Sequence, residues 1–407
     1  MADGPLRIPS ARNLLLARAV SGAGSWVQIS AASWYVLAQT GSAVAVGILA
    51  ALTFIPRILG SPVGGWLTDR HDIRRLGFLL GMLESVVPLL IAVLVWEGDM
   101  PIPALYVLVF IGAIPAAFAT PVMSTLEPLT VPVSMRPSMI ANTAVAYSFA
   151  RVCGPLLGSV LVIAVGVGGA FFVNGLSFWF NAFAARTAKL VDEGDAPTAS
   201  PHASYLAGVK HGWGFAAARA AIFAVLIFFG LVAPIQQLMP SIAQTQDASI
   251  VYVGVLLSAI AVGNIASNPF IRRAMRSRLT YRSLMGIGLL VSGPVLILLG
   301  INSNLAGDIA LLVVLGAAWE CIWVSARTSI QLDLPEHVTG RMLGLFYSAV
   351  TLGIAAGSLA MGLMFDYFGT RRSLVLLGVA VCAYGVFSGI RQRRDPGRQL
   401  SLTTEDG

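Results

Sequence analysis

Long apolar runs, each about 20 to 27 residues, recur along the whole sequence and contain few charged side chains. The chain is 57% hydrophobic and 11% charged, less than half of the charged fraction of about 25% in a soluble domain. Because lipid offers no partner to backbone polar groups, spanning segments must be helices or closed barrels, and these runs have helical length. The sequence therefore predicts an all-α integral membrane protein.

Twelve transmembrane helices are predicted, and the longest hydrophilic interruption follows the sixth. Their approximate ranges are 13–39, 43–68, 76–96, 103–126, 138–164, 168–188, 218–245, 250–271, 281–301, 305–330, 341–366 and 371–391. The interruption predicts an N-terminal six-helix bundle, a cytoplasmic linker, a C-terminal six-helix bundle and a cytoplasmic tail, at 1–188, 189–217, 218–392 and 393–407. Glycine-containing runs at Gly154–Gly166 and Gly353–Gly362, in corresponding helices, favour two pseudo-symmetric halves. Within the linker, Leu206, Val209 and Trp213 recur at helical spacing, which indicates a short amphipathic helix on the membrane surface.

Lys and Arg are concentrated on one side of this topology. About twenty of them belong to the termini and to the loops that follow even-numbered helices, whereas two, Arg371 and Arg372, lie on the opposite side. Cytoplasmic loops carry such an excess, so both termini are predicted to be cytoplasmic.

Several functions are excluded by what the sequence lacks. The basic residues form no continuous patch with interleaved aromatic side chains, so nucleic acid is not a predicted partner. The four histidines and three cysteines show no metal-ligand spacing, and no nucleophile–base pattern or P-loop is present. We therefore predict no metal, no cofactor, no enzymatic activity and no direct use of ATP.

A charged loop joins the second and third predicted helices. It contains Gly65, Asp69, Arg70, Arg74 and Arg75. These residues resemble the G-x-x-x-D-R-x-G-R-R signature of the major facilitator superfamily. Asp72 stands where the signature has Gly, and it resembles the D-R-x-D-R-R form of a branch that includes enterobactin exporters and macrolide efflux pumps, the transmembrane secretion effectors. Ile73 stands where Arg is usual.

Further segments are similar to that branch over nearly the whole chain. They include the run from Ser21 to Gly47, the sequence FARVCGPLLG around Arg151, and GRMLGL at 340–345. The resemblance implies the major facilitator fold, a place in the bacterial cytoplasmic membrane, and transport by alternating access with the charged loop as a conformational latch. The alternative for the loop arginines is that they only set topology. The equivalent place in the second half, Asn268 to Arg273, is basic but lacks the Asp, so the latch would be asymmetric.

Charged side chains inside predicted helices are the main candidates for function, because each costs about 2.5–3.5 kcal/mol at the bilayer centre on insertion scales. Arg57 precedes Asp72 by fifteen residues and Glu84 follows it by twelve, so both reach a similar depth on adjoining helices. We hypothesise that they pair and that Glu84 is a proton-coupling acid. The alternative is a permanent ion pair that joins the two helices.

Arg151 precedes Gly154 and Pro155 in the fifth helix. Because Pro155 removes a backbone hydrogen bond, a bend that moves during transport is predicted there. Arg151 would then face a cavity, or, alternatively, bind carbonyl groups freed by Pro155. In the tenth helix, Glu320 is the second proton-coupling candidate, and Arg327 lies two turns along the same face.

Neutral polar and aromatic side chains within the helices are candidates for lining a cavity. They are Gln28, Asn142, Tyr147, Gln236, Gln237, Asn264, Trp34, Trp319 and Trp323. Each has an alternative role as a helix–helix contact or an interfacial anchor. Glu127, at the inner end of the fourth helix, is interpreted as an interface group, and Arg18 is noted without a role.

These features predict a secondary active exporter of a siderophore-like or antibiotic-like compound, driven by proton-coupled alternating access. The alternatives are a proton-coupled importer of a small solute and a transport-inactive membrane scaffold or sensor. The expected partners are a small-molecule substrate, protons and the lipid bilayer, with the protein acting as a monomer.

Overall fold

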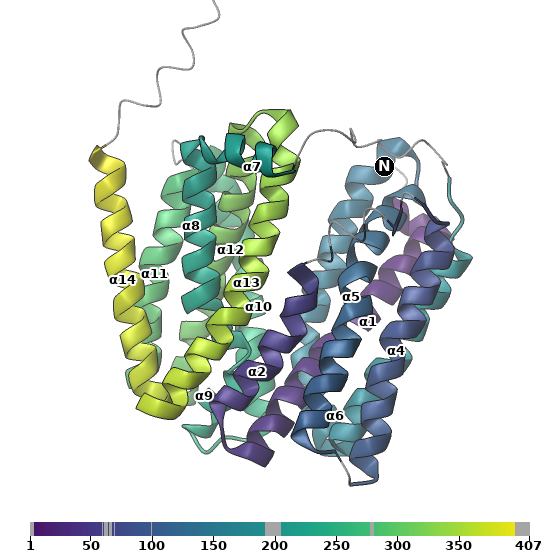
Figure 1. The fold of residues 1–407 in the computed structure, drawn as a ribbon, viewed down its shortest axis with the longest axis horizontal. Helices are drawn as coiled ribbons and strands as arrows, with labels where there is room; N and C mark the ends of the chain where they lie inside the picture. Colours follow the sequence, from purple (N-terminus) through teal and green to yellow (C-terminus); the bar gives the residue numbers. More distant parts are fainter. Residues whose placement is uncertain are drawn as a thin grey trace, which may run out of the picture.

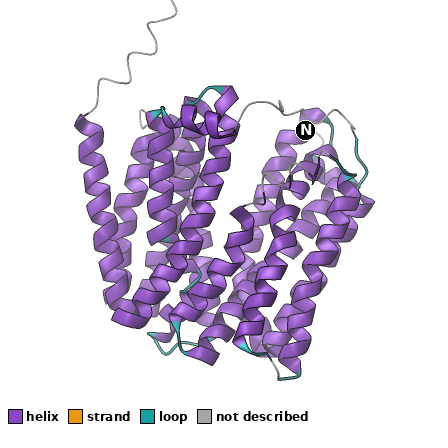
Figure 2. Ribbon diagram, in the orientation of Figure 1, coloured by secondary structure: helices purple, strands orange, loops and turns teal. Residues whose placement is uncertain are grey.

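The structure is a computed structural model that describes residues 4–58, 60, 64, 67–68, 70–98, 100–191, 205–276 and 281–394. Within these ranges the chain is almost entirely helical and forms no strand (Figure 2). The N-terminal half contains α1 (Pro9–Thr40), α2 (Ala43–Phe54), the 3-10 turn η2 (Ile55–Ile58), α4 (Ile73–Trp96), α5 (Ile102–Leu129) and α6 (Arg136–Thr187). The C-terminal half contains α7 (Tyr205–Trp213), α8 (Ala216–Leu231), η4 (Ala233–Gln236), α9 (Met239–Gln244), α10 (Ile250–Arg276), α11 (Tyr281–Ile301), α12 (Leu305–Asp333), α13 (Glu336–Phe368) and α14 (Thr370–Arg394).

The described helices follow the predicted spans with two differences, and residues 59, 61–63, 65 and 66 of the second predicted span lie outside the described residues. In the part of the chain that the structure describes, nine helices are long and apolar enough to cross a membrane, and α1 and α2 accompany them. One of the nine, α6, combines the fifth and sixth predicted helices, which are separated by Gly166 with a left-handed φ of 73°. The seventh predicted helix is divided into α8, η4 and α9, with Pro234 and Pro240 at the starts of the later pieces.

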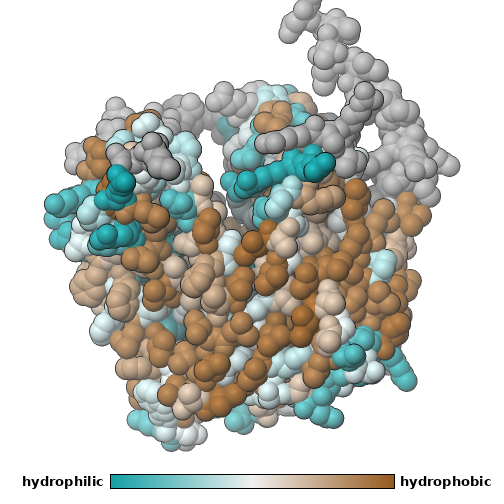
Figure 3. Space-filling view, turned by 180° about the vertical axis from the view of Figure 1, so that it is seen from behind, coloured by the Kyte–Doolittle hydropathy of each residue, from teal (hydrophilic) through white to brown (hydrophobic). Residues whose placement is uncertain are grey.

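The helices form two bundles, with α1, α2 and α4–α6 in one and α8–α14 in the other (Figure 1). The N-terminus, α7 and the C-terminal end of α14 all lie at the same end of the molecule, as an even number of crossings requires. On the face that Figure 3 shows, a belt of apolar side chains covers both bundles. Exposed leucine, isoleucine, valine and phenylalanine side chains are therefore placed where a bilayer would surround the protein.

The two bundles meet through α2 against α13 and through α6 against α10. Close backbone approach requires glycine in the first contact, because a Cβ atom on Gly47 would lie 2.5 Å from the carbonyl oxygen of Ser358. In the second contact, the hydroxyl groups of Ser258 and Ser159 donate to the carbonyl oxygens of Val152 (2.6 Å) and Ile250 (2.9 Å). The bundles separate toward the end that holds the termini, where Figure 3 shows a hollow between them.

Candidate functional site

Arg151 lies between the two bundles and is held by groups from both. Its guanidinium carbon lies 4.9 Å from the ring centroid of Trp319 on α12 and 5.9 Å from that of Trp26 on α1. In the amide orientation that matches donors to acceptors, Arg151 donates to the Asn264 side-chain oxygen on α10 from Nη1 at 2.5 Å and from Nη2 at 3.2 Å. Arg151 therefore links α6, which carries it, to α1, α10 and α12. Each cation–π contact is worth about 0.5–2 kcal/mol, depending on desolvation.

Asn264 is fixed in the orientation that receives Arg151. Its amide nitrogen donates to the carbonyl oxygens of Gly316 at 2.5 Å and Ile260 at 3.1 Å, and its side chain is 5% exposed. The guanidinium of Arg151 therefore binds a preorganised amide and two indole rings rather than carbonyl groups of its own helix. We call Arg151, Asn264, Trp26, Trp319 and Glu320 the central cluster.

Glu320 supplies the negative charge of the central cluster. It is half-buried and interacts electrostatically with Arg151. Among the described residues, the ion pairs closer than 4.0 Å are Arg18–Glu127 and Arg74–Asp72, so Glu320 is near Arg151 without a direct ion pair. Arg327 is exposed and forms no such pair with Glu320 either, although the two share a helix face.

A wall of aromatic rings extends from the central cluster into the C-terminal bundle. Its members are Trp319 and Trp323 on α12, Phe228 and Phe229 on α8, and Phe346 and Tyr347 on α13, with neighbouring centroids 5.2–6.0 Å apart. Three of them, Phe228, Phe229 and Phe346, are at most 2% exposed, whereas Tyr347 is 38% exposed. The sequence analysis named both tryptophans but missed the other four, because a phenylalanine in an apolar run carries no signal of its contacts.

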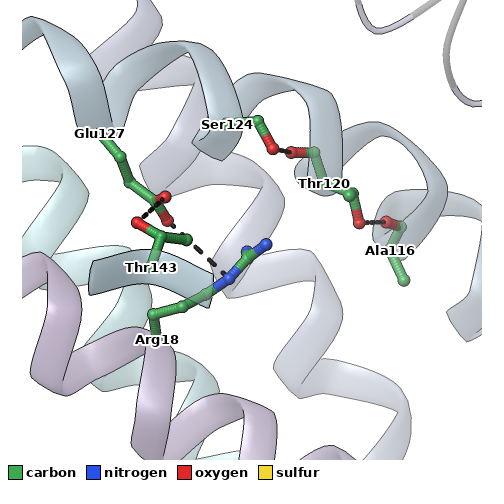
Figure 4. Close-up of polar contacts among 6 residues, drawn as sticks. All are labelled: Arg18, Ala116, Thr120, Ser124, Glu127 and Thr143. Carbon is green, nitrogen blue, oxygen red and sulfur yellow. Dashed lines mark hydrogen bonds and ion pairs between the residues drawn. The ribbon is translucent and has the colours of Figure 1, made fainter. Parts of the chain in front are cut away.

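A second charged group lies inside the N-terminal bundle, around Glu127 on α5 (Figure 4). Arg18 on α1 places Nε 3.8 Å from Oε1 of Glu127, and Thr143 on α6 donates its hydroxyl to Oε2 at 2.9 Å. The Glu127 side chain is 3% exposed and that of Arg18 is 21% exposed. Glu127 therefore joins three helices of one bundle, and its partner is the cation to which the sequence analysis gave no role.

Glu84 on α4 has two cations in electrostatic range, Arg18 and Arg57. Glu84 is 9% exposed, but the ion pair hypothesised with Arg57 is not formed within 4.0 Å in this conformation. The Arg57 guanidinium instead lies 5.0 Å from the ring centroid of Phe54 in the preceding turn. Tyr147 on α6 lies in the neighbourhood of both Arg57 and Arg151.

The remaining sequence candidates have more local roles or no special contact. Gln28 accepts a hydrogen bond from Asn174, which ties α1 to α6 within one bundle. Gln236 and Gln237 are buried, whereas Asn142 and Trp34 are half-buried. A Cβ on Gly154 would lie 2.6 Å from Cβ of Trp26, so this glycine allows α6 to approach α1.

The predicted bend at Pro155 is not where α6 departs from helical geometry. The non-helical residue is Gly166, eleven positions later, and the carbonyl oxygen of Pro155 accepts a hydrogen bond from Ser159 at 3.0 Å within a continuous helix. A transmembrane helix tolerates proline when its neighbours compensate, and here α1 and α10 pack closely against this stretch.

Part of the signature loop lies outside the described residues, namely Gly65 and Asp69. Within the described part, Asp72 caps the N-terminus of α4 by accepting from the backbone N–H groups of Arg74 at 2.9 Å and Arg75 at 3.1 Å. The Arg74 side chain also donates to Asp72, at 3.3 Å. Hydrogen bonds from the Arg75 amide and then from Arg74 lower the pKa of Asp72 below its ordinary value. The departure from the signature at position 72 therefore has a local cause, since an aspartate is a strong N-cap.

Replacing Asp72 by Ala is expected to destabilise the protein by about 1 kcal/mol through loss of this cap, whereas Asp72→Asn retains most of it. Folding lowers the pKa of Asp72, so its charged form stabilises the folded protein at pH values above the ordinary pKa of an aspartate. This stabilisation is lost as the pH falls through the lowered pKa of the folded state. Thermal unfolding of the purified protein in detergent at neutral pH measures the effect. Equal unfolding temperatures for the Ala and Asn variants would contradict it.

Comparisons with known proteins agree with this arrangement. The family model described as transmembrane secretion effector, a major facilitator superfamily model, matches residues 2–399. The uncharacterized MFS-type transporter YfiS of Bacillus subtilis is 23% identical over 96% of this chain and 95% of its own length. The multidrug efflux pump Tap of Mycobacterium tuberculosis is 22% identical over 92% of this chain and 91% of its own.

Among solved structures, a bacterial homologue of the human lysosomal transporter Spinster, in an inward-facing and unoccupied conformation, superposes with a TM-score of 0.77. It is 14% identical, and the match covers 95% of this chain and 97% of the other, so the likeness concerns the fold. With two helical bundles, charged clusters in their interior and a family match along nearly the whole sequence, the chain belongs to the transmembrane secretion effector family of major facilitator superfamily transporters.

Proposed function

We propose that this protein is a proton-coupled exporter that moves a small organic molecule out of the cytoplasm by alternating access. The observation that carries the proposal is the central cluster, where a cation, a carboxylate and two indole rings meet between the bundles. The similarity to the multidrug efflux pump Tap supports export as the direction.

The distribution of basic residues supports a bacterial cytoplasmic membrane with both termini in the cytoplasm. In that orientation, the end of the molecule where the bundles separate faces the cytoplasm, and the end where α2 contacts α13 faces outward. This conformation would then admit cargo from the cytoplasm toward Arg151. The contacts of α2 with α13 and of α6 with α10 would close the outer route.

Proton coupling is assigned to Glu320 and Glu84. Each lies in the protein interior and interacts with arginines, Glu320 with Arg151 and Glu84 with Arg18 and Arg57, without a direct ion pair that would fix its charge. Binding or loss of a proton on either carboxylate therefore changes the local field on an arginine. A potential of 100 mV is worth about 2.3 kcal/mol per charge, so one proton per cycle is sufficient for useful efflux.

The aromatic wall favours a lipophilic cargo with a flat ring. Tyr347 is exposed and Trp323 is half-buried, so their rings can stack against a bound molecule, while Arg151 favours an acidic or hydrogen-bond-accepting group beside them. An antibiotic-like compound and a siderophore-like compound both combine such groups.

Uptake into inverted membrane vesicles tests the function, because export in the cell becomes uptake in this orientation. A labelled fluoroquinolone, which combines a flat ring with a carboxylate, and a labelled catecholate siderophore serve as probes, with an acidic vesicle interior and with the pH gradient collapsed by an ionophore. The proposal expects one probe to accumulate only in vesicles that contain the protein and only with the gradient. Uptake of neither probe above vesicles without the protein would contradict it.

Glu320→Gln is expected to reduce gradient-driven uptake by about tenfold and to weaken its dependence on pH, because an amide at this position accepts no proton and Glu84 alone remains to couple. Exchange of probe between equal concentrations without a gradient should persist, since Gln keeps the size of the side chain. Glu97→Gln, at an exposed position after α4, is the matched control and should behave as the unaltered protein. Full pH-dependent uptake by Glu320→Gln would remove Glu320 from coupling.

A further inference from the structure

Asp366, in the last turn of α13, connects the C-terminal bundle to the start of α2 in the N-terminal bundle. Its Oδ2 atom accepts from the Ser42 hydroxyl at 2.5 Å and from the backbone N–H of Val44 at 3.1 Å. Its Oδ1 atom accepts from the backbone N–H of Ala43 at 2.7 Å. Both carboxylate oxygens of Asp366, a residue of the C-terminal bundle, therefore accept hydrogen bonds from the N-terminal bundle.

The start of α2 is suited to hold a carboxylate. The first N–H groups of a helix have no partner within it, and the helix dipole places positive potential there. Asp366 satisfies the first two of these groups, those of Ala43 and Val44, and Ser42 satisfies the third by accepting from the Ala45 N–H at 3.3 Å. Asp366 thus completes, across the interface, the cap that Ser42 begins.

Close packing of the two helices brings the carboxylate within reach. A Cβ on Gly362, one turn before Asp366, would lie 2.7 Å from the carbonyl oxygen of Ala43. Other hydrogen bonds that the described residues form between the bundles near this end come from neutral hydroxyls, those of Ser159 and Ser258. Charge-assisted hydrogen bonds are about twice as strong as neutral ones, so Asp366 contributes more per contact than these serines.

The contact is also reversible. Asp366 is exposed, so water can solvate the carboxylate and the α2 amides when the helices separate, and breaking the contact leaves no buried unsatisfied group. A rocking motion that opens this end must move α2 away from α13. The three hydrogen bonds of Asp366 are then lost in every cycle.

We propose that Asp366 is the positioning residue that holds the end of the molecule opposite the termini closed, and that its release from α2 is a required step of each transport cycle. The proposal rests on the alternating access of the proposed function. In this proposal, an aspartate bound at the beginning of α2 closes that end of the molecule. The signature loop is a different feature, because it follows the other end of the transmembrane segment that α2 begins.

Distances between spin labels test the proposal without any transport assay. In a background with the three cysteines, Cys153, Cys321 and Cys382, replaced by Ala, one label pair at Gln39 and Arg372 reports the closed end, and another at Ser134 and Leu332 reports the open end. For Asp366→Ala, the ratio of molecules open at the Gln39–Arg372 end to molecules closed there is expected to rise about tenfold. The distance between the labels at Ser134 and Leu332 is expected to shorten in the same molecules. Asp366→Asn, which keeps the shape and loses the charge, is expected to give a smaller shift in the same direction.

Asp247→Asn is the matched control, because Asp247 lies in the loop between α9 and α10 of the same bundle, is exposed, and has a left-handed backbone that Asn tolerates. Its distances should equal those of the unaltered protein. Distance distributions for both Asp366 variants that match the unaltered protein would overturn the proposal. Absence of drug or siderophore transport by the unaltered protein would contradict the proposed function. The distances would still test whether Asp366 holds this end of the molecule closed.

Discussion

Arg151→Ala is expected to lower the export rate at least about a hundredfold while the protein still reaches the membrane. The substitution removes the cation that the proposed function places beside the cargo, with its contacts to Trp319, Trp26 and Asn264. A loss of about 3 kcal/mol in the interactions that the transport step uses corresponds to roughly that factor in rate. It also leaves Glu320 without its nearby cation. Gradient-driven uptake into inverted vesicles, normalised to protein detected in the same membranes, measures the change.

Two further variants separate charge from geometry at this position. Arg151→Lys keeps the positive charge but loses the planar guanidinium that lies over Trp319 and bridges to Asn264, so about a tenfold loss is expected. Arg327→Ala removes an exposed arginine from α12 and should retain uptake. Unchanged export by Arg151→Ala would show that the contacts between the bundles at Arg151 are dispensable for transport.

The fold was predictable from the sequence because lipid leaves a long apolar segment no alternative to a helix. The helix boundaries were less predictable where a backbone dihedral angle, and not a polar residue, ends a helix. Gly166 separates the fifth and sixth crossings through a left-handed φ without any polar interruption, whereas the pattern around Pro155 drew attention to a point where α6 keeps helical dihedral angles.

The pairing of the charged sites was not predictable from their positions along the sequence. Counting residues from Asp72 placed Arg57 and Glu84 at a similar level, but depth along a helix says nothing about the direction of a side chain around it, and Arg57 lies over Phe54 instead. Contacts such as those of Arg151 with Asn264, or Asp366 with α2, depend on how one bundle sits against the other. No local pattern of residues carries that information.

Arg18→Ala is expected to produce the largest loss of stability among the interior substitutions. Glu127 would keep its hydrogen bond from Thr143 but lose its counter-ion. Its side chain is 3% exposed, so water could not replace the lost arginine. Removing one partner of a buried ion pair costs about 3–5 kcal/mol, and the lower end applies because Arg18 is itself partly exposed. Thermal unfolding in detergent, followed by intrinsic fluorescence, measures the loss.

The double variant Arg18→Ala with Glu127→Gln decides whether charge is the cause. If the cost of Arg18→Ala comes from an uncompensated carboxylate, a neutral amide that can still accept from Thr143 should restore most of the lost stability. Ser124→Ala, an exposed position on α5 whose hydroxyl donates to the carbonyl oxygen of Thr120 (Figure 4), should change stability by less than about 0.5 kcal/mol. A double variant as unstable as Arg18→Ala alone would mean that the arginine stabilises α1 through packing of its aliphatic stem, and that Glu127 does not depend on Arg18 for its charge.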